Sequence, residues 1–344
     1  MENRIKSKKV TEPLMTTYTQ HANLLAVLGT DNRTYEWILS NYIQLYINRD
    51  FLLNWGDFYF QYPYEIRSVE SCKWITTQKY TRKAINELCG GIINFALYHL
   101  KQNSYLNIMI DQYYIPGYYS YNEEHAHHDI FIFDYNDSRQ VFLASDFFDR
   151  TGYKTIEVKY SDFEKAFLSV MEDTPEDYDY FRGLNYVFSL KNECDYKFDV
   201  NNILNAVKEY INQTPPEYWT SYNYSNSKDI IFGSGIYTTL KNYIIRLQNE
   251  NANIFIDYRP FYLIFDHKKL MLLRMRYLSE NNYFTNKNQI IEAFEKLVEQ
   301  TKILYLTCVK FNIKYNKDAF SQINKMLDYI EKEEEKLLKA YFEL

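Results

Sequence analysis

The sequence predicts an α+β fold, with an antiparallel sheet in its first half and an all-helical second half. Between residues 107 and 158, short apolar stretches alternate with turn residues, which is typical of antiparallel strands. Beyond about residue 198, apolar residues recur at steps of three and four, which indicates amphipathic helices. With 344 residues, 46% of them hydrophobic, the chain can form one large domain or two smaller ones.

The N-terminal third is predicted to be a polar tail followed by helices. Residues 1–12 are polar and are expected to form a loose tail. A short apolar helix is expected over 22–29, where Gly29 is placed to end it. Bulky residues at helical spacing predict two further helices, over 35–47 and 79–101.

Strands and one helix complete the first half. The strands are expected at 107–111, 130–134, 141–144 and 154–158. A helix should begin near Ser161, because Ser161 and Glu164 have the spacing of a capping box. The acidic, proline-containing stretch 172–179 is expected to be a loop.

The second half is predicted to consist of five helices. They are expected at 201–212, 237–249, 260–278, 288–310 and 318–342. The change of character divides the chain into a first domain over 1–175, a linker over 176–197 and a helical domain over 198–344.

One predicted hairpin carries residues that are typical of a catalytic site. His128 lies at the start of its first strand, and Asp146 follows the second strand eighteen residues later. Antiparallel pairing about the turn at 136–138 would bring the two side chains together. Imidazole and carboxylate then form the base and orienting group that nucleophilic hydrolases and acyltransferases use. Judged by spacing alone, a structural role for the pair is the more common explanation.

Composition argues against several classes of function. The net charge of −6 does not favour binding to nucleic acid or to an anionic membrane. No window reaches the roughly 18 apolar residues of a membrane span, and the basic start lacks the apolar run of a secretory signal. The four cysteines lack CxxC spacing, which favours a reducing cytoplasm over a disulfide framework. His125, His127 and His128 lie close together, but no further ligand cluster accompanies them, so no metal site is expected.

Several segments resemble the butirosin biosynthesis protein H family. The segments are 106–116, 128–137, 144–148 and, less specifically, 256–271. The family consists of papain-fold relatives of the bacteriocin-processing cysteine peptidases of ABC exporters, usually encoded with nonribosomal peptide or polyketide biosynthesis genes. The resemblance covers about residues 15 to 280 and implies that the first domain is papain-like.

The resemblance also implies an activity. A Cys-His-Asp triad would accept an acyl group from the phosphopantetheine thioester of an acyl or peptidyl carrier protein and pass it to a small amine, forming an amide in antibiotic biosynthesis. His128 matches the family's base and Asp146 its orienting carboxylate. No resident cofactor is implied, and homodimer formation is left open. The alternatives are a peptidase or thioester hydrolase of the same fold, or an inactive scaffold that binds carrier proteins.

The nucleophile that the family requires is missing at the start of the first helix. A helix N-terminus lowers a thiol's pKa and supplies N–H groups for an oxyanion. Gln20 aligns with the family's cysteine, and Ala22 is the next candidate, but neither can attack a thioester. An engineered inactivating substitution would fit Ala22. A natural pseudoenzyme, or an enzyme without covalent catalysis, is the second explanation, and a shifted register that uses Thr17, Thr19 or His21 is the third.

Six further residues are candidates for substrate binding: His21, Asn23, Asp111, Tyr114, Arg259 and Lys268. Arg259 and Lys268 could bind a phosphate of the carrier arm. The alternative is a buried ion pair that fixes the helical half to the papain-like half. For Asp111 a turn-capping role is equally compatible with the sequence, and for Tyr114 ordinary packing is the simpler explanation.

Overall fold

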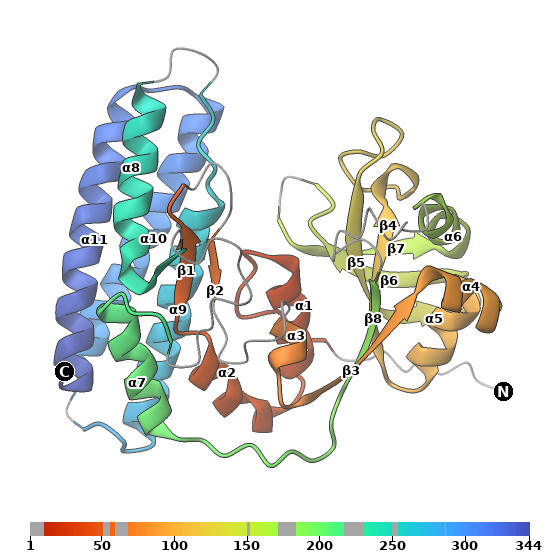
Figure 1. Ribbon diagram of the computed structural model, residues 1–344, viewed down its shortest axis with the longest axis horizontal. Coiled ribbons are helices and arrows are strands. Elements are labelled where there is room, and N and C mark those ends of the chain that lie inside the picture. Colours follow the sequence, from red (N-terminus) through yellow and green to blue (C-terminus); the bar gives the residue numbers. More distant parts are fainter. Residues whose placement is uncertain are drawn as a thin grey trace. The chain divides into compact units, whose positions relative to one another are not determined.

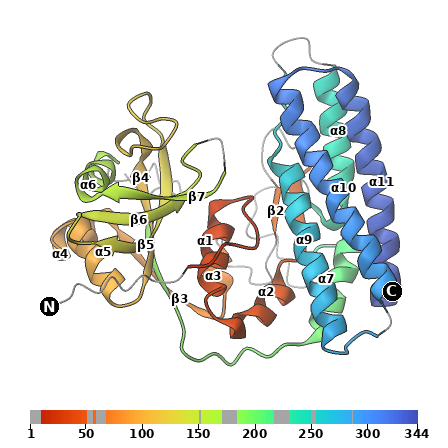
Figure 2. The ribbon, with the colours of Figure 1, turned by 180° about the vertical axis from the view of Figure 1, so that it is seen from behind.

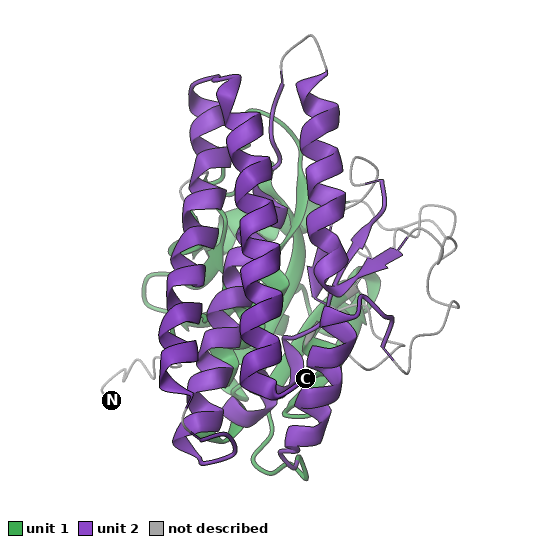
Figure 3. Ribbon diagram, turned by 90° about the vertical axis from the view of Figure 1, so that its left-hand side faces the viewer, with its two compact units in different colours: residues 1–34, 67–196 green, residues 35–66, 197–344 purple. Residues whose placement is uncertain are grey.

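The computed structural model describes residues 10–50, 56–58, 68–149, 152–170, 184–216, 230–249, 254–285 and 287–344. The chain divides into two compact units (Figure 3). Unit 1 comprises Met1–Thr34 and Arg67–Tyr196, and unit 2 comprises Tyr35–Ile66 and Lys197–Leu344. Helices, antiparallel sheets and a helical C-terminal region are all present, so the α+β class is confirmed.

Unit 1 is built on a six-stranded antiparallel sheet with the strand order β3-β8-β4-β5-β6-β7 (Figure 1). The strands are β3 (Ile75–Thr81), β4 (Tyr105–Asp111), β5 (His127–Asn136), β6 (Val141–Asp146), β7 (Lys154–Lys159) and β8 (Leu184–Leu190). The four strands predicted between residues 107 and 158 are confirmed as β4 to β7. β3 and β8 were not predicted, and their pairing extends the sheet beyond β4.

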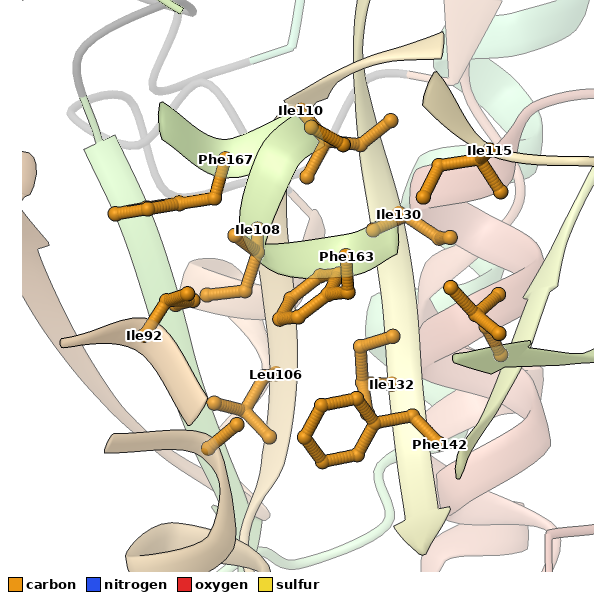
Figure 4. Close-up of a cluster of buried hydrophobic side chains, with 14 of the residues drawn as sticks. Ile92, Leu106, Ile108, Ile110, Ile115, Ile130, Ile132, Phe142, Phe163 and Phe167 are labelled. Atoms are coloured by element: carbon orange, nitrogen blue, oxygen red, sulfur yellow. The ribbon is translucent and has the colours of Figure 1, made fainter. Parts of the chain in front are cut away.

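One face of this sheet packs against α5 (Ile92–Lys101) and α6 (Tyr160–Ser169) (Figure 4). Strand alternation places every second residue of β4 on that face. The shared core includes Leu106, Ile108, Ile110, Ile130, Ile132, Phe142, Phe163 and Phe167. The same alternation leaves Asn107 on the opposite face, where it meets a residue of α1 (Thr19–Leu28).

The first helix ends as predicted at Gly29, for a different physical reason. Gly29 has an ordinary helical φ of −61°, and its N–H donates to the Leu25 carbonyl. A Cβ at Gly29 would lie 2.0 Å from Thr11 Oγ1, so the glycine allows the N-terminal segment to approach closely. Thr11 N–H donates to Ala26 O at 3.0 Å, which shows that the end of the predicted tail packs on α1. Residues 1–9 and the predicted loop 172–179 lie outside the described residues.

The helix predicted over 79–101 is formed as two helices, and the prediction is wrong only at its first three residues and at the break between the two helices. Lys79 and Tyr80 belong to β3, which precedes α4 (Arg82–Leu88) and α5. Gly90 and Gly91 have φ values of +67° and +95° and separate the two helices.

The predicted capping box at Ser161 is also wrong. Helix α6 begins at Tyr160, and its N-cap residue, Lys159, makes no side-chain cap. The Tyr160 N–H instead donates to the Gln140 carbonyl at 2.9 Å. A carbonyl of the neighbouring β5–β6 hairpin therefore accepts a hydrogen bond from the first N–H of this helix.

Unit 2 combines a small antiparallel sheet with five of the longer helices. The sheet has the order β2-β1-β9, formed by β1 (Leu45–Asn48), β2 (Gly56–Phe58) and β9 (Ile230–Phe232). The helices are α7 (Val200–Ile211), α8 (Ile236–Gln248), α9 (Arg259–Glu280), α10 (Asn288–Ile313) and α11 (Asp318–Phe342). All five helices predicted in the second half are confirmed (Figure 2).

The segment Tyr35–Ile66 belongs to unit 2, whereas the sequence predicts it to lie in the first domain. It contains α2 (Tyr35–Asn41) and β1, so the helix predicted over 35–47 is correct only in its first half. The fully buried Arg274 of α9 explains the assignment, because its guanidinium donates to the carbonyls of Leu39 at 2.5 Å and Tyr42 at 3.0 Å. A guanidinium at the end of α2 binds carbonyls that the helix itself leaves without partners.

The smaller elements are the helix α3 (Ser68–Ser71) and the 3-10 helices η1 (Asn32–Thr34), η2 (Gln112–Tyr114) and η5 (Gly233–Gly235). None of the described helices has both the length and the apolar character that a membrane span needs.

Candidate functional site

The hairpin formed by β5 and β6 brings His128 and Asp146 together, as the sequence predicts. The strands pair antiparallel, and Phe131 lies opposite Ser145 in the register. His128 Nδ1 lies 3.2 Å from Asp146 Oδ2. The Asp146 side chain is 1% exposed and that of His128 is 42% exposed. A buried carboxylate therefore stands behind an imidazole that solvent can reach.

Two further groups hold the Asp146 carboxylate. The hydroxyl of Tyr118 donates to Oδ2, and the backbone N–H of Phe147 donates to Oδ1 at 2.7 Å. Burial and the charge of Asp146 raise the pKa of Tyr118 well above its ordinary value, so the phenol stays protonated and acts as a donor. The carboxylate is thus surrounded by donors.

The electrostatics of the pair favour the charged form of His128. Burial lowers the pKa of His128, but the charge of Asp146 and its hydrogen bond, together with Asp129, outweigh burial and raise the pKa to about 10. Nδ1 also lies 2.8 Å from the Asp129 carbonyl oxygen. At neutral pH His128 is therefore an imidazolium that can give a proton from Nε2, and it becomes a base once that proton has left.

A chain of hydrogen bonds links this pair to α1. Tyr153 Oη donates to Asn23 Oδ1 at 2.7 Å, and Asn23 Nδ2 donates to Asn107 Oδ1 at 3.1 Å. Asn107 Nδ2 in turn donates to Asp129 Oδ2 at 3.2 Å. Asp129 is the neighbour of His128 along β5, so the network fixes α1 relative to the strand that carries the imidazole.

The residues predicted around the missing nucleophile differ in their surroundings. Gln20 is the second residue of α1 and is partly buried, whereas Ala22 is fully buried. His21 is 1% exposed, and its ring centroid lies 6.4 Å from that of Tyr18. Asn23 is also buried, and its amide is used within the protein. His21 and Asn23 are therefore packed inside unit 1, and a role in substrate binding stays a prediction for both.

Asp111 caps a turn, which is the alternative that the sequence allowed. Its Oδ1 accepts the N–H groups of Tyr113 at 3.1 Å and Ala126 at 3.2 Å. Its Oδ2 receives His125 Nδ1 and Ser169 Oγ, both at 2.6 Å. The oxygens of Asp111 are buried and occupied by protein donors. Asp111 is therefore not placed to bind a substrate, and the turn-capping alternative is favoured.

Tyr114 forms part of an aromatic cluster beside that turn. Its ring centroid lies 5.0 Å from that of Tyr113 and 6.0 Å from that of His125, and it packs on the core of unit 1. These contacts favour the packing role, and a role in substrate binding stays a prediction.

In the described part of the chain, His, Cys, Asp and Glu side chains form no group of three that could hold a metal ion.

The prediction that Lys268 binds a phosphate is wrong. Lys268 is fully buried in unit 2, and its Nζ lies 2.5 Å from Glu334 Oε1 of α11. It also donates to Tyr210 Oη at 3.0 Å and to His267 Nδ1 at 2.8 Å. Lys268 does form a buried ion pair, but this pair joins α9 to α11 within unit 2 and is not the predicted link between one half of the chain and the other. Arg259 is exposed and pairs with Asp257 at 2.5 Å, so its role in phosphate binding stays a prediction.

Sequence reasoning did not identify four residues of the site: Tyr118, Asn107, Asp129 and Tyr153. The polar Asn107 between apolar neighbours of a buried strand is the one signal that could have been noticed. Tyr118 could not be distinguished from the other 35 tyrosines, because its contact with Asp146 depends on how the loop before β5 folds.

No protein-family model matches the sequence, and no curated protein matches it either.

Proposed function

We propose that the protein transfers acyl groups from thioesters to amines, with His128 and Asp146 handling the proton. The observation that carries the proposal is the half-exposed imidazole backed by a buried, fully hydrogen-bonded carboxylate. Such an arrangement is typical of groups that move protons in a reaction. The resemblance of segments 106–116, 128–137 and 144–148 to the butirosin biosynthesis protein H family supports a carrier-protein phosphopantetheine thioester as donor. We place the reaction in the cytoplasm.

The chemistry balances without a cysteine. The nitrogen of the amine attacks the thioester carbonyl, so that a C–N bond forms and the C–S bond breaks. His128 gives its Nε2 proton to the departing sulfur and, as a neutral imidazole, takes the proton that the amine releases. Because a thioester is already activated, holding the two reactants together and moving one proton can suffice.

The alternative is a protein that binds the carrier without reacting. It is favoured by the start of α1, where Ala22 is buried and the amide of Asn23 is committed to Asn107 and Tyr153. Cys72 and Cys308 do not replace the nucleophile, because burial raises the pKa of both thiols.

The test is the incubation of the protein with acyl-pantetheine thioesters and a panel of small amines. Thiol release and the masses of the products should show amide formation above the uncatalysed rate, and intact-mass analysis should show no acyl-enzyme. His128→Asn should lower the rate about 100-fold, since acid–base catalysis contributes on that order. His127→Asn removes an exposed neighbouring imidazole and should leave the rate unchanged. Equal rates for wild type and His128→Asn would exclude the proposal, and carrier binding without turnover would favour the scaffold.

A further inference from the structure

Tyr118 and His128 meet on the same oxygen atom of Asp146. The Tyr118 hydroxyl donates to Oδ2, and His128 Nδ1 lies 3.2 Å from that oxygen. The other oxygen is held by the N–H of Phe147, the next residue in the chain. Phe147 can follow Asp146 when the strand end moves, whereas Tyr118 contacts the carboxylate from a separate segment, so Tyr118 provides an independent anchor.

The anchor itself is closely packed. The Tyr118 side chain is 5% exposed and belongs to the hydrophobic core that α5 and α6 form on the sheet. Its ring centroid lies 4.7 Å from that of Phe148, and the Tyr119 N–H donates to the Phe148 carbonyl at 2.8 Å. The phenol is therefore held by the packing of its ring and by the backbone hydrogen bond between its neighbour Tyr119 and Phe148, two residues after Asp146.

We propose that Tyr118 is a positioning residue, which fixes the Asp146 carboxylate against His128 and competes with the imidazole for the same oxygen. The hydrogen bond from Tyr118 and the ion pair with His128 draw on the charge of the same oxygen, so each interaction weakens the other. The consequence for catalysis rests on the proposed function, but the competition for Oδ2 can be measured without any substrate.

Among the described residues, the charged groups found against His128 are Asp129 and Asp146, and both can be kept constant. Asp129 neighbours it on β5 and lies with Oδ1 4.0 Å from Nδ1, and Asp146 faces it from β6. The phenol of Tyr153 is influenced by the charge of Asp146 as well. Replacing Tyr118 alone leaves Asp129, Asp146 and Tyr153 in place, so a change in the titration of His128 reports on the Tyr118 hydroxyl.

The experiment is an NMR titration of the six histidines in the full chain, with the signal of His128 assigned from His128→Asn. Tyr118→Phe keeps the ring and removes the hydroxyl. We expect the pKa of His128 to rise by about half a unit to one unit, a three- to tenfold gain in proton affinity. Tyr119→Phe, which changes a 65% exposed tyrosine next in sequence, should leave it unchanged. An unchanged or lowered pKa in Tyr118→Phe would overturn the proposal.

A second substitution protects the test against loss of folding. Replacing Tyr118 by 3-fluorotyrosine keeps the hydrogen bond and makes the phenol a stronger donor, so the pKa of His128 should fall by a few tenths of a unit. A rise or no change would again count against Tyr118. If no thioester is turned over but these shifts occur, only the proposed function fails. If turnover occurs without the shifts, only the role of Tyr118 fails.

Discussion

The side-chain amide of Asn23 donates a hydrogen bond to Asn107 Oδ1 at 3.1 Å and so joins α1 to β4 across 84 residues of sequence. Both side chains are buried, and Asn107 passes the connection on to Asp129 beside His128. The imidazole strand and the start of the chain are therefore parts of one polar network within unit 1.

Asn107→Ala should destabilise the protein by about 2–3 kcal/mol, because it leaves the buried amide of Asn23 and a carboxylate oxygen of Asp129 without this partner. Urea unfolding measures the loss. Asn94→Ala is the matched control, since the Asn94 amide makes one exposed hydrogen bond to Gly90 O and its loss should cost about 0.5 kcal/mol or less. Combining Asn107→Ala with Asn23→Ala should cost less than the sum of the two single changes. Strict additivity would contradict the network.

Asp146→Asn should have a pH-dependent effect on stability. The folded-state pKa of His128, about 10, lies above its ordinary value of 6.5, so the stabilisation is fully present below about pH 6.5 and is lost as the pH rises through 10. The variant should therefore lose about 1–2 kcal/mol more at pH 6 than at pH 10.5, well below the full linkage value because the ring is 42% exposed.

The control for this pH dependence is Glu157→Gln, which removes an exposed ion pair with Arg139. Its cost should be small, and its difference between the two pH values should be below that of Asp146→Asn. Urea unfolding of wild type and both variants at each pH gives the comparison. An equal effect of Asp146→Asn at pH 6 and pH 10.5 would mean that His128 does not gain its charge from Asp146.

The helices and strands that were predicted correctly are those in which the spacing of apolar residues within the element itself determines how it packs. The second-half helices and the strands β4 to β7 are examples, and the pairing of His128 with Asp146 follows from a hairpin whose ends are eighteen residues apart. β3 was missed because its partner β8 is more than 100 residues away in the sequence, and β1 lies between the nearby β2 and the still more distant β9. The helical spacing of apolar residues in these stretches was overridden by that distant pairing.

The errors at individual residues have a different cause. A basic residue in a sequence does not reveal whether its charge is solvated or paired, and Lys268 is fully buried against Glu334. Asp111 and Tyr118 both lie at turns beside β4 and β5, where the chain path decides which donor reaches which carboxylate. Such contacts depend on tertiary structure, so spacing alone could not separate the residue that caps a turn from the residue that holds Asp146.

The buried ion pair of unit 2 gives the last prediction. Lys268→Met should destabilise the protein by about 3–5 kcal/mol, because it leaves Glu334 charged in the interior with only the hydroxyls of Tyr210 and Tyr237. Adding Glu334→Leu should restore most of that loss, since a matched apolar pair no longer requires a buried charge. Unfolding in urea reports both effects.

Lys336→Met is the control for the buried pair. Lys336 is 69% exposed and pairs with Glu333 at 3.1 Å, so its loss should cost about 0.5 kcal/mol or less. If Lys268→Met and Lys336→Met cost the same, the charge of Glu334 must be neutralised in the folded protein. The polar core of α9 and α11 would then be held by the tyrosine hydroxyls alone, and adding Glu334→Leu to Lys268→Met would lower stability further.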